Sequence, residues 1–383
     1  MHARDPDPES PPKTRPRPII IAAGGTGGHF FPAEALASEL VRRGHEVGLM
    51  TDRRAGIREK GIFAGRQQFV LPGAGIAGRG AVRAARAALA LAHGTWRARA
   101  ILRGLQPAAV VGFGGYPSVP PLLGAHLMGR DRPLIFLHEG NAVMGRANAF
   151  LSRWARAIAT SFPTVAGLPP GVPVTETGMP VRPDIATVHD VPYHPSSGVI
   201  RLLVWGGSLG ARIFSDIVPA ALATLPPPLR ARIEVTQQVR PEDMERVRAA
   251  YGACAIPASV APFLDNVPDL LRDAHLVIGR AGGSSVAEVT VAGRPAILVP
   301  LPIAASDEQS ANARALVAAG AAWMIPQAEL TPDRLAAMLV ELLGDRDALA
   351  RAATAARAIG RPDAAARLAD MIEGCLHPMA SAA

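Results

Sequence analysis

The 383-residue sequence is poor in cysteine, aromatic residues and lysine. The first two scarcities argue against particular classes of protein, and the third explains the source of the net charge. Its two cysteines, Cys254 and Cys375, offer neither a disulfide framework nor the spacing of a metal site, so a reducing cytoplasm is the simple inference. Aromatic residues make up only 4% and no RNA- or DNA-binding motif occurs, so nucleic acid is not an expected partner. Lysine occurs only at Lys13 and Lys60, so the net charge of +8 comes from arginine and indicates a compositional bias.

The sequence also lacks a long apolar run and an acidic metal-binding motif. The longest uncharged stretch, residues 104–129, is broken by prolines and glycines, and no transmembrane helix is predicted. Residues 1–17 are rich in proline and charge, which predicts a disordered tail and not a signal peptide. The Asp-x-Asp strings at residues 5–7 and 345–347 fall in that tail and in a late loop, so no metal site is expected.

The most informative feature present is a glycine-rich segment at residues 24–29, Gly-Gly-Thr-Gly-Gly-His. It follows a strand-like run at residues 18–23 and precedes a helix, because apolar residues recur at helical spacing over residues 33–41 and Gly44 closes the run. Glycines let the backbone turn tightly and approach a ligand, and the next helix points its free N–H groups at that ligand. The segment predicts a cradle for a diphosphate, with the His29 imidazole at its lip.

Two other interpretations of this segment stay open. It can be an ordinary glycine-rich turn of a parallel α/β protein. It can also belong to a nicotinamide dinucleotide site, since Asp52 closes a second strand, residues 46–51, about where a ribose-binding acid falls in that motif. The spacing argues against the dinucleotide site, because Phe30 stands where the third glycine belongs.

The chain is too long for one compact α/β core of usual size, so two domains are expected. Strand-like runs at residues 109–113 and 134–137 alternate with helical patterns, which predicts a parallel sheet. A proline-rich break at residues 163–183 is typical of a linker. Beyond it, a strand at residues 201–205 leads into a second glycine loop at residues 206–211, so two Rossmann-like halves are predicted.

The second half is expected to continue with strands at residues 276–278, 296–299 and 323–325, which alternate with helices at residues 285–292, 307–319 and 331–343. A last helical run, residues 363–375, could cross back onto the first half. Ligands of such sheets bind beyond the carboxyl ends of the strands, so each loop that follows a strand is a candidate wall of one site.

Several of these loops carry side chains suited to a nucleotide sugar. Glu288 can accept hydrogen bonds from a ribose diol, Gln309 can bind sugar hydroxyls, and Arg182 can neutralise a phosphate. His29 is the best base on chemical grounds. Each residue also has a plain structural explanation, as a helix-dipole partner, a solvated surface group or, for His29, a helix cap.

Taken together, these motifs resemble those of the MurG family of bacterial N-acetylglucosaminyltransferases, from about residue 19 to the last helix. The strings that carry the resemblance occur in the family's order and at family-like spacing: residues 24–29, Gly114-Gly115-Tyr116, His138-Glu139-x-Asn141, Gly178-x-Pro180-Val181-Arg182, Gly206-Gly207-Ser208-x-Gly210-Ala211, Glu288 and Gln309-x-x-Asn312-Ala313. One such string is weak support for the family, whereas all of them in order are strong support.

The resemblance implies an α/β protein with the GT-B fold, in which two Rossmann-like domains with parallel sheets flank an interdomain cleft. It implies an acceptor- and membrane-binding domain at residues 18–178, joined by a C-terminal helix at residues 361–383, and a donor domain at residues 179–360. The implied reaction is inverting transfer of N-acetylglucosamine from UDP-N-acetylglucosamine (UDP-GlcNAc) to the 4-hydroxyl of the muramoyl sugar of lipid I, forming lipid II in peptidoglycan synthesis. Lipid I is the polyprenyl-diphosphate-linked muramoyl-pentapeptide. No cofactor or metal is implied, since UDP-GlcNAc is a substrate.

By the same resemblance, His29 would be the catalytic base that helps to deprotonate the acceptor hydroxyl. The residues implied to bind UDP-GlcNAc are Thr26, Gly27, Gly28, Asn141, Arg182, Ser208, Leu264, Gly283, Ser284, Ser285, Glu288 and Gln309. The residues implied to contact the acceptor diphosphate are Gly25, Gly114, Gly115 and Tyr116. Gly140 and Leu209 stand where the family generally has Gln, and Met179 where it has Asn, so three polar side chains are missing from the site loops.

A basic amphipathic segment from Ile76 to Arg103 predicts contact with an anionic membrane surface. It carries several arginines and no acidic residue, interleaved with apolar residues such as Leu89 and Trp96. The alternative is a solvated arginine-rich helix that packs through its alanines. Because the implied acceptor is lipid-linked, the resemblance favours a peripheral protein at the cytoplasmic face of the bacterial inner membrane.

Three rival functions stay open. One is a GT-B enzyme with another lipid acceptor, and a second is a catalytically silent sugar-nucleotide binder, prompted by Gly140 and Leu209. The third is a nicotinamide-dependent oxidoreductase, which predicts tight NADH binding and dependence on Asp52. The transferase instead predicts that UDP protects the protein against unfolding and that Asp52→Ala has little effect.

Overall fold

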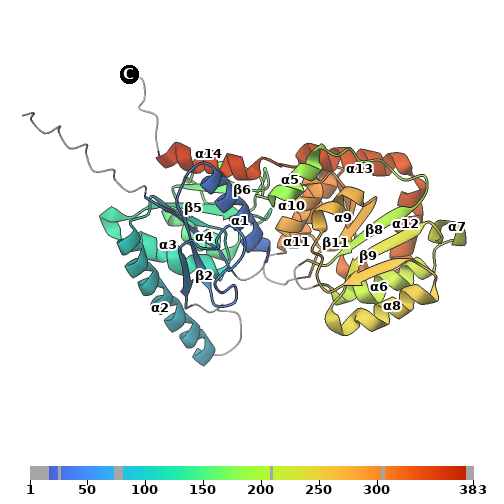
Figure 1. Cartoon of the computed structure of the whole chain (residues 1–383), viewed down its shortest axis with the longest axis horizontal. Coiled ribbons are helices and arrows are strands. Elements are labelled where there is room, and N and C mark those ends of the chain that lie inside the picture. The colour runs from blue at the N-terminus through green and yellow to red at the C-terminus, as the bar shows by residue number, and fades with distance from the viewer. Residues whose placement is uncertain (1–16, 25–26, 73–80, 208–209, 303–306, 377–383) are drawn as a thin grey trace, which may run out of the picture.

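The computed structural model describes residues 17–24, 27–72, 81–207, 210–302 and 307–376, without the side chains of residues 81–84. These residues form two α/β lobes that lie side by side along the long axis of the molecule (Figure 1). Each lobe is built on one sheet of parallel strands. The predicted tail, residues 1–17, lies outside the described residues except for Arg17.

The first sheet has seven strands in the order β3-β2-β1-β4-β5-β6-β7. These strands are β1 (Ile19–Ala22), β2 (Val47–Asp52), β3 (Gln68–Leu71), β4 (Ala109–Gly112), β5 (Leu134–Glu139), β6 (Ala157–Thr160) and β7 (Val174–Glu176). The accompanying α-helices are α1 (Gly27–Arg42), α2 (Ala81–Leu105), α3 (Val119–His126) and α4 (Arg146–Leu151). Strands β2 and β3 are added on one side of β1, and strands β4 to β7 are added on its other side, so the strand order reverses between β1 and β4. At such a reversal, the loops beyond the carboxyl ends of the two strands separate and leave a crevice for a ligand.

The second sheet has six strands in the order β10-β9-β8-β11-β12-β13, with the corresponding reversal between β8 and β11. These strands are β8 (Ile200–Trp205), β9 (Ile233–Gln238), β10 (Ala258–Ala261), β11 (Leu276–Gly279), β12 (Ala296–Leu298) and β13 (Ala322–Met324). The α-helices are α5 (Pro183–Ala186), α6 (Arg212–Ala223), α7 (Pro227–Arg230), α8 (Met244–Ala253), α9 (Val267–Asp273), α10 (Gly283–Val291), α11 (Glu308–Ala318), α12 (Pro332–Gly344) and α13 (Arg346–Ile359). The two halves therefore repeat one plan.

Buried apolar residues hold this plan together. The central strands of the first sheet, β1 and β4, are buried on both faces, and β1 illustrates this with Ile19, Ile20 and Ile21 fully buried. One cluster around Ile19 and Ile21 packs the first sheet against α1, and another fills the outer part of the second lobe around Phe214. A third cluster runs through both lobes, from Ile20 to Val286 of α10, so the lobes share apolar contacts.

Helix α1 begins earlier than the sequence pattern indicates, at Gly27 instead of after His29. Gly27 and Gly28 are therefore helical, and the prediction that they form a tight turn is wrong. The missing side chain at Gly27 serves packing instead, because a Cβ there would lie 2.8 Å from Cε2 of Phe31. The first helical turn keeps its free N–H groups, so the helix end remains suited to an anion.

The chain passes between the lobes twice. It leaves the first sheet after β7, which lies inside the proline-rich segment predicted as a linker, and it returns at Arg361 between α13 and α14 (Ala364–Leu376). Helix α14 lies along the first lobe (Figure 1), where Leu368 and Ile372 join the buried cluster of β1 and α1. The last helix of the chain therefore completes the hydrophobic core of the N-terminal lobe.

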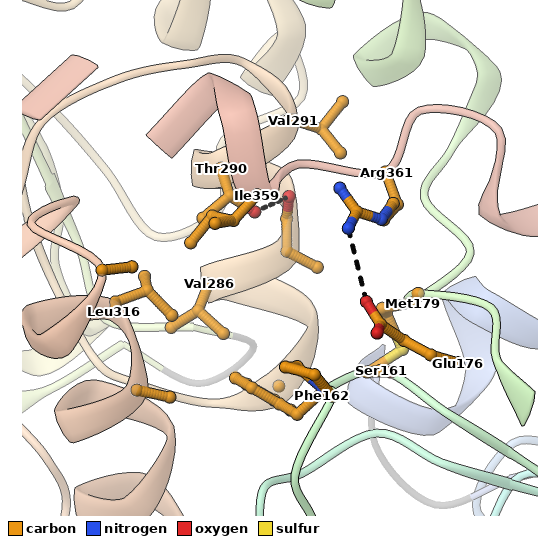
Figure 2. Close-up of a pocket in the computed structure, with 16 residues that line it drawn as sticks. Ser161, Phe162, Glu176, Met179, Val286, Thr290, Val291, Leu316, Ile359 and Arg361 are labelled. Carbon is orange, nitrogen blue, oxygen red and sulfur yellow. Dashed lines mark hydrogen bonds and ion pairs between the residues drawn. The ribbon is translucent and has the colours of Figure 1, made fainter. Parts of the chain in front are cut away.

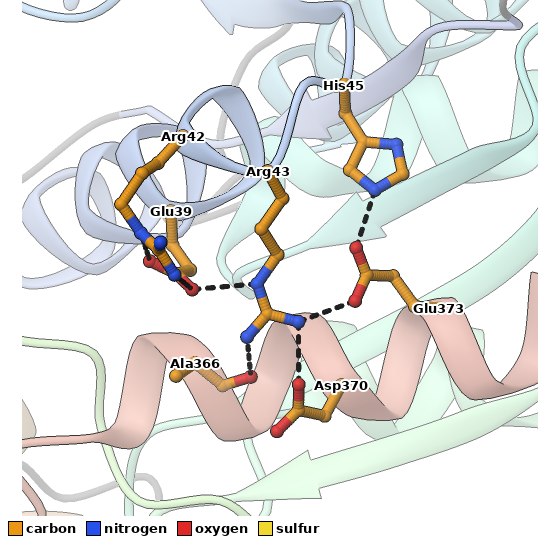
Figure 3. A network of polar contacts seen from close by, with 7 residues as sticks. All are labelled: Glu39, Arg42, Arg43, His45, Ala366, Asp370 and Glu373. Atoms are coloured by element: carbon orange, nitrogen blue, oxygen red, sulfur yellow. Dashed lines mark hydrogen bonds and ion pairs between the residues drawn. The ribbon is translucent and has the colours of Figure 1, made fainter.

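Charged residues fasten α14 to the end of α1 (Figure 3). Arg43, whose side chain is 18% exposed, donates from Nη1 to Asp370 at 2.6 Å and to Glu373. Its Nε also donates to Glu39, one turn earlier, at 2.7 Å. The second oxygen of Glu373 lies 2.7 Å from Nε2 of His45. This network adds directional contacts to the apolar ones and fixes the position of α14.

Helix α2 projects along the outer side of the first lobe (Figure 1) and packs on α3. Ala98 and Leu102 are buried, whereas Leu89 and Trp96 are 70% and 69% exposed. Among the described residues, no helix combines the length and the apolar character needed to cross a membrane.

Candidate active site between the lobes

A cleft of about 740 Å³ opens between the lobes. Its first-lobe wall comprises Gly27, Gly28 and Phe31 of α1, and Arg182 contributes from the segment that connects the lobes. Its second-lobe wall comprises residues that end or follow strands β8 to β12, among them Trp205, Leu264, Ser284, Ser285, Glu288 and Gln309. The cleft thus lies beyond the carboxyl ends of the strands, as the parallel topology predicts.

His29 lies in the first turn of α1 and is oriented by the end of β4. Its Nδ1 is 2.8 Å from the carbonyl oxygen of Phe113. A carbonyl only accepts hydrogen bonds, so Nδ1 carries the proton and Nε2 keeps its lone pair in the neutral ring. Nε2 faces the next glycine turn, 3.4 Å from where a Cβ on Gly115 would stand. The contact with Phe113 therefore directs Nε2 of the imidazole at that turn.

The Gly114–Gly115 turn needs glycine for its conformation, since φ is +84° and +67° at the two positions. Space at the turn is also tight, because a Cβ on Gly114 would lie 3.3 Å from Nδ2 of Asn148. Tyr116 follows and its hydroxyl donates to the carboxylate of Asp52. The structure thus brings together His29 and the described residues predicted to contact the acceptor diphosphate, all beside the reversal between β1 and β4.

Arg182 and Glu288 meet inside the cleft. Glu288, in the second turn of α10, is 3% exposed, and its Oε1 lies 3.4 Å from Nε of Arg182. Burial raises the pKa of the Glu288 carboxyl, and the charge of Arg182 opposes that shift. The Arg182 guanidinium also lies 5.1 Å from the ring centroid of Phe31 on α1. Arg182 therefore joins a residue of each lobe.

The beginning of α10 forms the adjoining wall. Ser284 and Ser285 lie in its first turn, where backbone N–H groups are unpaired within the helix. Gln309, in the first turn of α11, accepts a hydrogen bond from the Leu301 amide at 3.0 Å through Oε1. Leu264 completes this part of the cleft. The second lobe offers helix ends together with carboxylate and carboxamide side chains, which suit the phosphates and hydroxyls of a nucleotide sugar.

Two predicted donor-binding residues do not line the cleft. Asn141 accepts a hydrogen bond from Nδ2 of Asn312 at 3.0 Å through its Oδ1, while Oδ1 of Asn312 accepts from the Ala142 amide at 2.7 Å. Gly283 lies against this loop, because a Cβ there would be 2.3 Å from the Gly140 carbonyl oxygen. Asn141 and Gly283 thus form a contact between the lobes beside the cleft.

Residues 138 and 139 differ from the polar loop expected after Leu137, because they are the last residues of β5. His138 is buried, which lowers its pKa to about 4, and its Nε2 donates to the Gly178 carbonyl. Glu139 accepts from the backbone N–H groups of Asn141 and Gly145. Both side chains therefore shape the loop that follows β5.

Gly25, Thr26 and Ser208, which were also predicted to bind substrate, lie outside the described residues. Conversely, the sequence pattern missed Phe31, Gln238 and Arg240, which line the cleft. Gln238 ends β9 and Arg240 follows it, so recognising this strand would have placed both residues at the site. Among the described residues, no group of three or more His, Cys, Asp or Glu side chains is arranged to hold a metal ion.

A second, smaller cavity of about 160 Å³ lies between the lobes near the two chain crossings (Figure 2). Apolar side chains such as Phe162, Met179 and Val286 line it, and Arg361 and Glu176 pair across 3.4 Å at its edge. Met179 also explains one departure from the family pattern, because a Cβ on Gly140 would lie 2.4 Å from the Met179 methyl group. The Met179 side chain fills the space next to Gly140.

The fold and the cleft define the class of the protein, and sequence families agree with it. Residues 19–160 match the glycosyltransferase family 28 N-terminal domain, and residues 201–368 match the glycosyltransferase family 28 C-terminal domain. The predicted class, an α/β protein of the two-domain GT-B type, is thereby confirmed. The protein is a glycosyltransferase, and the oxidoreductase alternative has no support.

Individual relatives narrow the assignment. A UDP-N-acetylglucosamine--N-acetylmuramyl-(pentapeptide) pyrophosphoryl-undecaprenol N-acetylglucosamine transferase from Gluconobacter oxydans is 57% identical over 94% of this chain and 99% of its own length. A protein of the same name from Granulibacter bethesdensis is 57% identical over 94% of each chain. The crystal structure of Acinetobacter baumannii MurG superposes with a TM-score of 0.74 at 30% identity, covering 93% of this chain and 98% of that one. The chain belongs to the MurG family, as its motifs indicated.

Proposed function

We propose that this protein transfers N-acetylglucosamine from UDP-GlcNAc to the 4-hydroxyl of the muramoyl sugar of lipid I, with inversion at the anomeric carbon and without a metal. The observation that carries the proposal is the cleft, in which the His29-bearing lobe faces the helix ends, Glu288 and Gln309 of the other lobe. The names of the relatives supply the identities of donor and acceptor.

On the donor side, the beginning of α10 from Ser284 to Glu288 binds uridine and ribose, and Gly283 lets this helix end pack against the Gly140 loop. Glu288 accepts from the ribose diol, which then replaces Arg182 as the partner of this buried carboxylate. Arg182, released from Glu288, pairs with the donor diphosphate together with Ser208. Leu264 contacts uracil through its backbone, and Gln309 binds the sugar hydroxyls, while Asn141 supports the neighbouring wall through Asn312.

On the acceptor side, His29 accepts the proton of the 4-hydroxyl at Nε2 while that oxygen bonds to the anomeric carbon. The bond from this carbon to the UDP oxygen breaks in the same step, and the electron pair leaves with UDP. Arg182 and the N–H groups at the helix ends stabilise the departing diphosphate. Thr26, Gly27 and Gly28 face the donor sugar and phosphates, while Gly25, Gly114, Gly115 and Tyr116 contact the acceptor diphosphate.

The protein meets its lipid-linked acceptor at the cytoplasmic face of the inner membrane, through the surface from Ile76 to Arg103. The described part of this segment presents Leu89, Trp96 and nearby arginines to solvent. The guanidinium of Arg99 lies 5.4 Å from the Trp96 ring centroid and donates to the Leu127 carbonyl at 2.8 Å. Through this hydrogen bond the exposed Leu127, which directly follows α3, becomes part of the same apolar and basic surface.

Release of UDP from UDP-GlcNAc, measured with a soluble lipid I analogue in the presence of EDTA, tests the proposal. We expect turnover that depends on the analogue and is unchanged by EDTA. UDP binding without turnover would indicate a silent sugar-nucleotide binder, and turnover only with a different lipid-linked sugar would indicate another acceptor. Loss of turnover with EDTA would contradict metal-independent transfer.

A further inference from the structure

Asp52 occupies a place between the two loops that flank the reversal of the first sheet. It ends β2, is 3% exposed, and lies next to the glycine segment after β1, since a Cβ on Gly24 would be 2.7 Å from Oδ1 of Asp52. The same Cβ would lie 3.2 Å from the side chain of Pro117, in the loop after β4. Gly24 therefore allows the two loops and the carboxylate to pack together without a side chain between them.

Hydrogen bonds join this carboxylate to two further side chains. Tyr116 donates its hydroxyl proton to Oδ2 of Asp52. Arg54 donates from Nε to the same Oδ2 at 3.1 Å and to the Tyr116 hydroxyl oxygen at 2.9 Å. Its guanidinium also lies 4.8 Å from the Tyr116 ring centroid. Oδ1 of Asp52 accepts from the Ala55 amide at 3.2 Å, so the turn that carries Arg54 is fixed by the same carboxylate.

The two ends of this arrangement differ in exposure. Asp52 is buried, whereas the Arg54 side chain is 60% exposed. The guanidinium of arginine is planar, and its N–H donors match the spacing of phosphate oxygens. The Nε contacts of Arg54 and its stacking on the Tyr116 ring already restrict its conformation, so the side chain loses little conformational entropy when it binds a phosphate. The exposed cation stands beside Tyr116 and the glycine turn, where the proposed function places the acceptor diphosphate.

We propose that Asp52, Arg54 and Tyr116 form one acceptor clamp, in which buried Asp52 orients the Tyr116 hydroxyl and the Arg54 guanidinium toward the acceptor diphosphate. Arg54 and Tyr116 are binding residues in this clamp, and Asp52 is a positioning residue that acts through them. The clamp rests on the proposed function, because its ligand is the acceptor of that reaction. It also reverses the expectation that Asp52→Ala has little effect in a transferase.

Steady-state kinetics with both substrates varied separately tests the clamp. In Asp52→Asn and in Arg54→Gln we expect KM for a soluble lipid I analogue to rise about tenfold, because a charge-assisted contact is lost. KM for UDP-GlcNAc stays within about twofold, because the donor cleft is formed by other residues. Arg54→Lys restores part of the acceptor affinity, since it keeps the charge but not the fork.

A double-mutant cycle and a matched control complete the experiment. Asp52→Asn combined with Tyr116→Phe is expected to raise acceptor KM little beyond the larger single effect, because the two side chains form one hydrogen bond. Asp131→Asn changes an exposed aspartate that precedes β5 and so lies at the amino-terminal ends of the parallel strands, opposite the end that carries Asp52, and it is expected to behave as wild type.

The clamp would be overturned if Arg54→Gln left the KM for the lipid I analogue unchanged. It would also be overturned if Asp52→Asn raised the KM values for both substrates equally. In either case, turnover by the wild-type enzyme would still support the transferase. Arg54→Gln alters an exposed side chain, so it decides the question even if Asp52→Asn does not fold. Wild-type enzyme that releases no UDP with the analogue would instead overturn the proposed function, and the clamp with it.

Discussion

The two lobes share one topology but carry different side chains where the strand order of each sheet reverses. At the reversal of the first sheet stand His29, Asp52 and Tyr116, which accept, donate or hold protons. At the reversal of the second sheet stand the glycine turn at Gly206 and Gly207, the end of α10 and the carboxylate of Glu288, which suit binding of a charged nucleotide. The proposed function therefore assigns proton transfer to one lobe and donor recognition to the other, on one fold plan.

The largest expected effect is on the chemical step in the first lobe. His29→Ala removes the base, and we expect kcat to fall by about 10² to 10⁴, the usual contribution of a positioned acid or base. Steady-state UDP release measures it, with His194→Ala, an exposed histidine of the second lobe, as the control. Near-wild-type turnover of His29→Ala would show that another group is the base.

The next effect belongs to donor binding in the second lobe. Glu288→Gln replaces a buried carboxylate that faces Arg182, and we expect KM for UDP-GlcNAc to rise about 10- to 100-fold with a smaller change in kcat. Glu341→Gln, on the exposed side of α12, is the matched control. An effect confined to kcat would place Glu288 in the chemical step and would contradict the assignment of the second lobe to donor binding alone.

A smaller effect is expected where α14 docks on the first lobe. Arg43→Gln removes the guanidinium that contacts Glu39, Asp370 and Glu373, so the backbone amides of α14 are expected to exchange about tenfold faster or more. Hydrogen exchange measures this difference, with turnover per folded molecule unchanged. Exchange that rises equally in α12 of the second lobe would show global destabilisation instead of local release.

The smallest effect is a pH dependence of the same contact. A hydrogen bond from Arg42, with help from Arg43, lowers the pKa of Glu39 from 4.5 to about 2 against the opposing effect of burial. Because the folded-state pKa is depressed, the stabilisation is fully present above pH 4.5 and is lost as pH falls toward 2. Hydrogen exchange of the end of α1 across this range is expected to show the loss in wild type and not in Glu39→Gln.

Much of the fold followed from the sequence, because long apolar runs and helical spacing mark buried elements. Strands such as β9 and β10 were missed, because the alternation of apolar residues with Glu234, Thr236 and Ser259 is short and lacks the continuous apolar run that marks β1 and β4. The missed β9 hid Gln238 and Arg240 from the predicted site.

The side-chain contacts of the site were less predictable from the sequence than the location of the cleft. Loops after strands located the cleft, but nothing in the local sequence shows that Asn141 pairs with Asn312 across the lobes or that His138 is buried. The same holds for Asp52, whose position suggested a ribose-binding acid and whose contacts are instead with Tyr116 and Arg54. Such pairings depend on residues far apart in the chain, so local patterns do not contain them.

Calorimetric titration of UDP into His29→Ala and Glu288→Gln side by side tests the division between the lobes most directly. The predicted result is a UDP affinity within about twofold of wild type for His29→Ala and at least about tenfold weaker for Glu288→Gln. Loss of UDP binding in His29→Ala, or wild-type binding in Glu288→Gln, would contradict it.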